Sequence, residues 1–190
     1  MGVAERKCRE RAERERRITA TARLIAAREG WSAVTIRRLA EEIEYSQPVL
    51  YSHFENRDAI VAAVAVEGFR ELTAALRNAP HPAANHRTAM CAVATAYLGF
   101  ACEHPRLYEA MFTMPTNLHF ADAETKPELR AAFAALEAVV ASPGNDNAVA
   151  TETFWAALHG LAELERSGRI RLGGRAERIT LVVAGLSLGR

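Results

Sequence analysis

The sequence predicts an all-α protein of about nine helices, with a three-helix N-terminal head and a larger helical body. Apolar residues recur at helical spacing through most segments, and no sustained stretch alternates as a half-buried strand does. The chain has 190 residues, of which 49% are hydrophobic and 25% charged, a balance that excludes disordered and fibrous proteins. We place the head at residues 1–57 and the body at residues 58–190.

Three helices are expected in the head. The first passes through a mixed-charge stretch over residues 6–17, continues with an apolar stripe, and ends at Gly30. Thr35 can cap a second helix over residues 36–43, and Ser46 can cap a third that begins at Gln47 or Pro48. These lengths and spacings indicate a compact head of one long and two short helices.

The mixed-charge stretch places glutamate and arginine four residues apart, at Glu5/Arg9, Glu10/Arg14 and Glu13/Arg17. This spacing favours a solvated helical extension. An arm that binds DNA remains the alternative.

Six further helices are expected in the body. Asn56 precedes a long helix that stops at Ala79-Pro80. Others cover about residues 90–101, 105–112, 129–140, 148–167 and 175–188, with a loop over 114–125 and a turn at 142–147.

The last of these helices is apolar on nearly all sides, which a surface helix of a monomer should not be. We expect it to pack on the body with one side and on a second subunit with another. A central core helix in a monomer remains the alternative. The residues assigned to the homodimer interface are Trp155, Leu158, Leu161, Ile179, Val182, Val183 and Leu186.

The net charge of +1 conceals an asymmetry, because residues 1–57 carry 12 basic and 9 acidic residues while residues 58–190 carry 12 and 14. A basic head is compatible with nucleic-acid binding. No apolar run reaches the length of a membrane-spanning helix, and the charged N-terminus does not resemble a signal peptide. We therefore expect a cytoplasmic protein.

Residues 35–57 contain the most informative pattern. A helix that enters the major groove brings its N-terminal turn closest to the base edges. Here that turn holds Ser46, Gln47, Pro48 and Val49. The amide of Gln47 can bond adenine, while Pro48 and Val49 can contact a thymine methyl group. The third helix is therefore the candidate recognition helix.

Other polar side chains in this segment suit the DNA backbone. Tyr51, His53 and Arg57 lie further along, where they can reach phosphates without reading sequence. Arg37 and Arg38 begin the preceding helix, whose N-terminal dipole also favours a phosphate.

This segment resembles the helix-turn-helix of the TetR family of bacterial transcriptional regulators, with its pattern L-A-x-x-x-x-x-S-x-x-x-L-Y-x-H-F-x-x-(K/R). The residues in register are Leu39, Ala40, Ser46, Leu50, Tyr51, His53, Phe54 and Arg57. The resemblance covers about residues 17–65. It implies an all-α homodimer that binds a palindromic double-stranded DNA operator and leaves it when a small-molecule effector binds the body, usually as a repressor.

The resemblance also implies residue roles. Gln47, Pro48 and Arg37 fall on positions that commonly face bases, and Thr35, Tyr51, His53 and Arg57 on positions that hold or approach the backbone. Glu44 departs from the family, which usually has a glycine at this turn. Either Glu44 adopts a positive φ at a cost of about 1 kcal/mol, or the turn is built differently. With Glu41, Glu42 and Glu55 it also weakens the attraction to phosphates.

A second resemblance lies in Trp155, His159 and Gly160, which match the W-x-x-x-H-G pattern of one group of TetR-like C-terminal domains. Aromatic and sulfur-containing side chains suit an apolar ligand pocket. The candidate pocket residues are Tyr97, Phe100, Met111, Phe112, Trp155 and His159. Packing within the core remains the alternative role for these side chains.

We do not expect an enzyme. The sequence has no glycine-rich phosphate loop, no nucleophile elbow and no cluster at metal-ligand spacing, so no catalytic residue, cofactor or metal is assigned.

A second hypothesis assumes the same fold in a protein that does not bind an operator. In this alternative the protein is a helical dimer that binds only a small molecule or a protein, and the acidic residues near the recognition turn motivate it.

Overall fold

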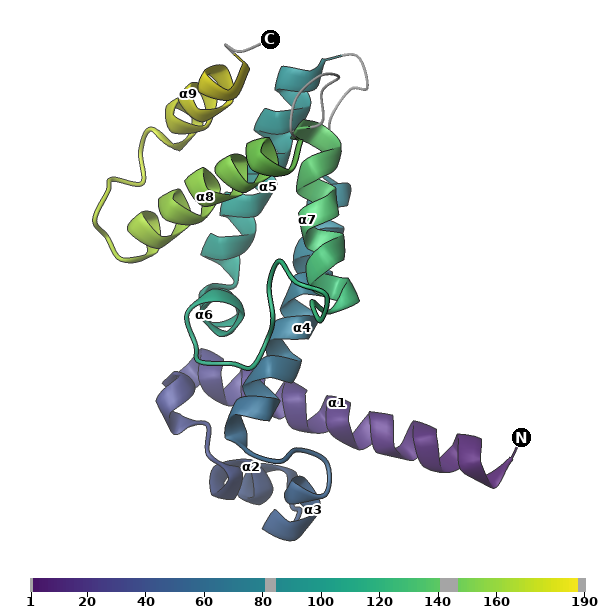
Figure 1. Cartoon of the computed structure of the whole chain (residues 1–190). Helices are drawn as coiled ribbons and strands as arrows, with labels where there is room; N and C mark the ends of the chain where they lie inside the picture. The colour runs from purple at the N-terminus through teal and green to yellow at the C-terminus, as the bar shows by residue number, and fades with distance from the viewer. Residues whose placement is uncertain (1, 81–84, 141–146, 188–190) are drawn as a thin grey trace. The chain divides into compact units, whose positions relative to one another are not determined.

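The computed structural model describes residues 2–80, 85–140 and 147–187, and it confirms the all-α class (Figure 1). Within these residues there are nine α-helices and no strand. The helices are α1 (Val3–Glu29), α2 (Ile36–Ile43), α3 (Gln47–Tyr51), α4 (Arg57–Arg77), α5 (His86–Glu103), α6 (Pro105–Phe112), α7 (Pro127–Val140), α8 (Asn147–Arg166) and α9 (Arg175–Ser187). A short 3-10 helix, η1 (Trp31–Ala33), was not expected.

The predicted helix boundaries agree closely with the structure. α4 begins where expected because the Asn56 side chain accepts a hydrogen bond from the backbone of Ala59, at 2.8 Å. The turn predicted at 142–147 lies outside the described residues except for Asn147, which begins α8. The linker predicted after Ala79-Pro80 continues into residues 81–84, which also lie outside the described part.

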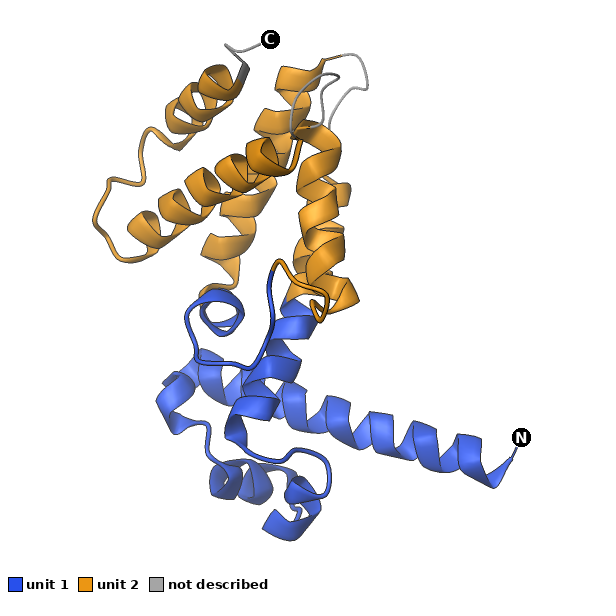
Figure 2. Cartoon of the chain, in the orientation of Figure 1, with its two compact units in different colours: residues 1–68, 106–120 blue, residues 69–105, 121–190 orange. Residues whose placement is uncertain are grey.

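The chain forms two compact units that are each discontinuous in sequence (Figure 2). The head unit comprises residues 1–68 and 106–120, and therefore holds α1 to α3, the first half of α4, and nearly all of α6. The body unit comprises residues 69–105 and 121–190. The functional boundary predicted after residue 57 stays a prediction.

The head unit has its own apolar core. The predicted stripe of α1 is confirmed, because Ile18, Ala22 and Ile25 are fully buried. α6 packs closely on α4 at Gly68, where an added Cβ would lie 2.6 Å from Met111 Sδ. A larger residue at this position would therefore force the Met111 or Leu107 side chain to shift.

The body unit is built on α5, which contacts α7, α8 and α9. Its largest fully buried side chains include Tyr97 and Phe154. One side of α9 is open in the single chain, since Leu181 is 72% exposed. In the described part of the chain, no helix combines the length and apolarity needed to cross a lipid bilayer.

Candidate nucleic-acid interface

The turn between α2 and α3 is fixed by local hydrogen bonds. The predicted cap of α2 is confirmed, because Thr35 Oγ1 accepts a hydrogen bond from the backbone N–H of Arg38 at 3.1 Å. Glu44 ends the helix in the left-handed region, at φ 58° and ψ 37°, which is the first of the two alternatives for this turn. The N–H of Tyr45 then donates to the carbonyl of Ala40 at 2.9 Å, which closes a Schellman-type turn.

The recognition helix candidate α3 is short and held by one buried side chain. Leu50 is completely buried, while Gln47 and Pro48 are exposed and Val49 is half-buried. Ser46 occupies the N-cap position as expected, but its side chain makes no capping hydrogen bond. The first turn of α3 therefore presents Ser46, Gln47 and Pro48 to the surroundings, with Leu50 as the anchor.

Tyr51 ends α3 and is 53% exposed, so its hydroxyl is available to an external partner. This placement fits the predicted backbone contact.

The two arginines of α2 already have carboxylate partners in the free protein. Arg37 Nε lies 2.9 Å from Glu41 Oε1, and this hydrogen bond raises the pKa of Arg37. Arg38 Nη2 lies 3.4 Å from both Glu29 Oε1 and Glu42 Oε2. A phosphate that binds either arginine would therefore compete with a carboxylate.

His53 and Arg57 have partners inside the head unit, not the outward orientation suggested by the sequence. The His53 side chain is only 6% exposed, and its Nδ1 lies 3.4 Å from Glu15 Oε1 on α1. Arg57 donates from Nε to the carbonyl of Val34 at 2.8 Å and from Nη2 to that of Trp31 at 2.7 Å. Both side chains therefore connect elements within the head unit.

Two residues that the sequence interpretation missed also support the turn. Arg17 Nη2 donates to the carbonyl of Ile43 at 3.2 Å, and its guanidinium lies 5.2 Å from the centroid of the Tyr45 ring. A cation at the C-terminal end of α2 also complements the helix dipole. The available signal was an aromatic residue in the turn and an arginine at the end of the charged stretch.

The six candidate pocket residues are divided between the two units. Met111 and Phe112 belong to the head unit, and the other four belong to the body unit. There the indole Nε1 of Trp155 donates to the hydroxyl of Tyr97 at 3.1 Å, and the rings of Trp155 and His159 are 6.5 Å apart. The structure thus brings together Tyr97, Trp155 and His159.

The ionisable groups of this part of the body are perturbed by burial. Burial lowers the pKa of His159, against the opposing effect of Glu163. Burial also acts to raise the pKa of Glu165, but hydrogen bonds from Arg175 and Arg178 outweigh it and lower that pKa. Glu165 Oε2 lies 2.6 Å from Arg175 Nη2, and Glu165 Oε1 lies 2.7 Å from Arg178 Nη2.

The structure corrects part of the interface assignment. Leu158, Ile179 and Val183 are fully or almost fully buried in the single chain, because this side of α8 and α9 packs on the body itself. They leave no surface for a partner. The remaining assigned residues are half-buried: Trp155, Leu161, Val182 and Leu186.

Comparison with known proteins gives two family matches. Residues 18–64 match the profile described as "Bacterial regulatory proteins, tetR family", and residues 90–184, half of the chain, match "Tetracyclin repressor-like, C-terminal domain". The chain is 33% identical over 144 residues to an HTH-type transcriptional regulator of Mycobacterium tuberculosis, Rv0681. That alignment covers 74% of this chain and 65% of the regulator.

Two solved structures show the same fold. A Rhodococcus protein of unknown function has a TM-score of 0.73 at 26% identity, covering 92% of this chain and 94% of its own. A TetR variant from Acinetobacter baumannii, solved in complex with minocycline, has a TM-score of 0.64 at 18% identity, covering 90% and 93%. Together with the helix-turn-helix geometry, the matches over both parts of the chain show that this protein belongs to the tetR family of bacterial regulatory proteins.

Proposed function

We propose that this protein regulates transcription by binding a palindromic DNA operator as a homodimer, with a small-molecule effector controlling this binding, most simply as a repressor. The observation that carries the proposal is the first turn of α3, in which Gln47 and Pro48 are exposed while Leu50 anchors the helix. An exposed amide at the start of a short helix is suited to base edges in the major groove.

The proposed interface separates base recognition from support. Gln47 reads a base, with a discrimination of about 1 to 3 kcal/mol for a bidentate contact. Tyr51 contacts the backbone, while His53 and Arg57 hold the helices in place through their internal partners. Ser46, Val49, Thr35, Arg37 and Arg38 complete the proposed DNA-binding set.

Exposed apolar side chains support the homodimer. Leu181 on α9 is 72% exposed and Leu164 on α8 is 38% exposed, and Trp155 and Leu161 of α8 are half-buried. Such surface is costly in water and is typical of an interface. A dimer would place two recognition helices about 34 to 36 Å apart, matching half-sites one helical turn apart.

The body unit supports an effector site. Tyr97, Trp155 and His159 combine apolar surface with polar atoms, and one fold relative was solved with minocycline. An effector that releases DNA must bind the non-binding arrangement more tightly, because equal affinity shifts no equilibrium. We therefore assign DNA binding to residues 1–57 and effector binding and dimerisation to residues 58–190. A regulator of this kind acts on chromosomal DNA in the cytoplasm and does not act as an enzyme.

The test uses palindromic duplexes from the DNA that adjoins the protein's own gene, with fluorescence anisotropy as the measurement. Gln47→Ala should relax base preference at one position in each half-site, because the amide is the reading group. Tyr51→Phe should weaken all duplexes alike, because a phosphate contact carries no sequence information. If Gln47→Ala ranks all operator variants as the wild type does, Gln47 does not read a base.

A second candidate function is a helical dimer that binds a ligand or protein partner but no operator. The pairing of Arg37 and Arg38 with glutamates favours it, since these cations are not free for phosphates. It predicts no sequence-specific binding at moderate salt, whereas operator binding predicts specific complexes with steep salt dependence.

A further inference from the structure

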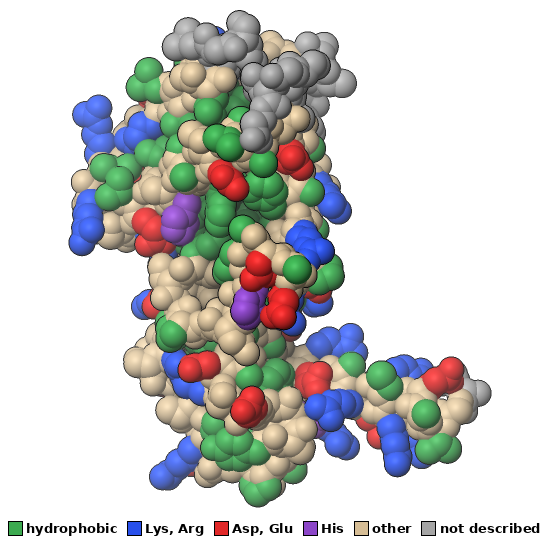
Figure 3. Space-filling view, viewed as in Figure 1, with side chains coloured by type: hydrophobic (Ala, Val, Ile, Leu, Met, Phe, Trp, Pro, Cys, Tyr) green, Lys and Arg blue, Asp and Glu red, His purple; other side chains and the backbone are tan. Residues whose placement is uncertain are grey.

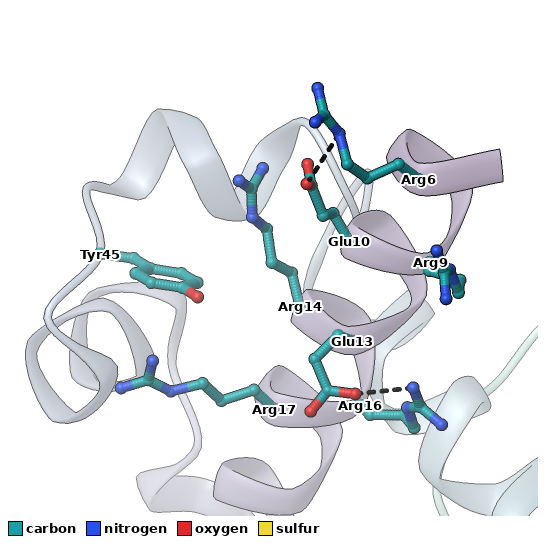
Figure 4. Close-up of a pocket in the computed structure, with 8 residues that line it drawn as sticks. All are labelled: Arg6, Arg9, Glu10, Glu13, Arg14, Arg16, Arg17 and Tyr45. Atoms are coloured by element: carbon teal, nitrogen blue, oxygen red, sulfur yellow. Dashed lines mark hydrogen bonds and ion pairs between the residues drawn. The ribbon is translucent and has the colours of Figure 1, made fainter. Parts of the chain in front are cut away.

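The N-terminal part of α1 and the turn before α3 form an open groove of about 610 Å³ within the head unit (Figure 4). Seven of its eight lining residues lie on α1, and the eighth is Tyr45 of the turn. The lining residues are Arg6, Arg9, Glu10, Glu13, Arg14, Arg16, Arg17 and Tyr45. Figure 3 shows basic side chains along the same helix.

The groove is strongly cationic, since it holds five guanidinium groups and two carboxylates. Both carboxylates are paired with arginines, Glu10 with Arg6 at 3.7 Å and Glu13 with Arg16 at 2.6 Å. Among the described residues, Arg9 and Arg14 have neither a carboxylate nor a hydrogen-bond partner. Two charged side chains are therefore available to an anion.

This pairing differs from the one that the sequence spacing predicts. Glu10 pairs with Arg6 and not with Arg14, and Glu13 pairs with Arg16 and not with Arg17. Glu5 accepts a hydrogen bond from the backbone of Gly2 at 2.9 Å and so does not neutralise Arg9. The spacing would leave Arg6 and Arg16 without a carboxylate, whereas the structure leaves Arg9 and Arg14.

The groove is held in a fixed position next to the recognition turn. Arg17 bonds the carbonyl of Ile43 and lies over the ring of Tyr45, which directly precedes the α3 cap residue Ser46. The contact of His53 with Glu15 joins α1 to the segment after α3. A duplex with α3 in its major groove would therefore bring backbone phosphates near this part of α1.

We propose that this groove is a second DNA contact, in which Arg14 and Arg9 bind phosphates that flank the base pairs read by α3. The inference rests on the proposed operator binding and adds residues outside the helix-turn-helix. Guanidinium groups bind phosphate oxygens through paired N–H donors, and such contacts add affinity without sequence preference. Because the groove is open and lies beside the turn, a DNA strand could pass along it with its phosphates facing the arginines.

The test compares Arg14→Gln with Lys7→Gln. Lys7 lies on the same helix and has no partner among the described residues, but it does not line the groove, so it controls for the loss of one charge. Both substituted side chains are exposed on α1. Circular dichroism and gel filtration establish that the fold and assembly of each variant match the wild type. Affinity is measured by fluorescence anisotropy at several salt concentrations.

Arg14→Gln should weaken binding to an operator with long flanks about three- to tenfold at 0.1 M salt, as expected for one lost charged contact on each protomer. The slope of log K against log salt should fall by about 0.9 for each lost phosphate contact, or about 1.8 for a dimer. Lys7→Gln should change affinity less than about twofold and leave the slope nearly unchanged.

Shortening the operator flanks by about half a helical turn on each side provides the second comparison. The wild type should lose affinity on the shortened duplex, while Arg14→Gln should bind both lengths nearly equally. Equal effects of Arg14→Gln and Lys7→Gln, or a wild type that ignores the flanks, would overturn the inference while operator binding stands. A wild type that binds no duplex specifically would overturn both proposals.

Isothermal titration with inorganic phosphate, without DNA, separates the two sources of the anion. The DNA contact would be overturned if the wild type binds phosphate, Arg14→Gln does not, and the DNA affinity of the wild type does not depend on flank length. The groove would then be assigned to a small anion.

Discussion

Replacing Glu44 with glycine should stabilise the protein, because Glu44 is in the left-handed region, at φ 58° and ψ 37°. The two hydrogen bonds that close this turn come from backbone groups of Glu44 and Tyr45, so the substitution preserves them. The Glu44 side chain is exposed and has no partner among the described residues. The substitution therefore removes backbone strain without removing a side-chain contact.

The magnitude follows from two opposing effects. A non-glycine residue in the left-handed region costs about 1 to 2 kcal/mol. Glycine offsets part of this gain, because its greater conformational entropy stabilises the unfolded chain by about 0.5 to 1 kcal/mol. The expected net increase in the unfolding free energy is about 0.5 to 1 kcal/mol, or a rise in Tm of about 2 °C for a chain of this size.

Glu44→Gly should also tighten DNA binding, through the loss of a negative charge beside the recognition helix. Two charges about 10 Å apart in water interact by about 0.4 kcal/mol, and salt at 0.1 M reduces this further. Summed over the nearest phosphates, the affinity should rise about 1.5- to 3-fold, and the gain should decrease as salt increases.

Glu44→Gln is the matched control, because it removes the charge and keeps a residue with a Cβ at this φ. Urea unfolding followed by circular dichroism should show a stability gain for the glycine variant alone, while both variants should gain DNA affinity. Equal stability of the glycine and glutamine variants would refute the strain argument. A gain in affinity for glycine but not for glutamine would show that turn flexibility, and not charge, limits binding.

Three further predictions concern the packing of each unit. Glu165→Gln should lower the unfolding free energy by about 2 kcal/mol, because it leaves two partly buried arginines without their carboxylate. The exposed Glu152→Gln on the same helix should change it by less than about 0.5 kcal/mol. Since the folded-state pKa of Glu165 is lowered, the advantage of the wild type should be full above the unfolded pKa and shrink as the pH falls through the folded value; a constant difference in acid would contradict this. Gly68→Ala should cost about 1 kcal/mol in urea unfolding, because overpacking exceeds the gain in helix propensity. The cost should become smaller in a Met111→Ala background, where Leu107 Cδ1 at 2.9 Å remains the close contact, and an unchanged cost would contradict the proposed clash. The lowered pKa of His159 means that the unfolded chain binds more protons once the pH falls below the ordinary value of 6.5. The unfolding free energy should therefore fall as the pH is lowered below 6.5, and His159→Gln should lack this pH-dependent loss. Identical pH profiles would show that His159 does not contribute.

Helix positions could be predicted from the sequence because their determinants are local. Thr35 caps α2 through a bond to Arg38, three residues away, and Asn56 caps α4 in the same way. The left-handed turn at Glu44 was indicated by the resemblance, because the family usually has a glycine at this position. The apolar stripe of α1 follows from helical periodicity alone.

The partners of polar side chains could not be predicted in this way. His53 and Arg57 have residue types that suit phosphates, but their partners, Glu15 and the carbonyls of Val34 and Trp31, lie 23 to 38 residues away in the chain. The return of α6 to the head unit also depends on a long-range contact, in which Met111 packs against Gly68. Residue type therefore indicated which hydrogen bonds and ion pairs a side chain can form, while tertiary packing determined which partners it has.

The arrangement of charge in the head favours selectivity over raw affinity. Exposed ion pairs such as Arg37–Glu41 contribute little to stability, so a correctly placed phosphate can replace the carboxylate at small cost. On random DNA the same carboxylates reduce the attraction to phosphates, and non-specific binding, which depends on that attraction, becomes weak. In the proposed function, the acidic residues of α2 and its turn would thus lower affinity for all sequences, while the base contacts from α3 would be made only at the operator. A cationic groove on α1 would restore part of the lost affinity where α3 is already docked, because Arg17 and Tyr45 fix its position relative to that helix.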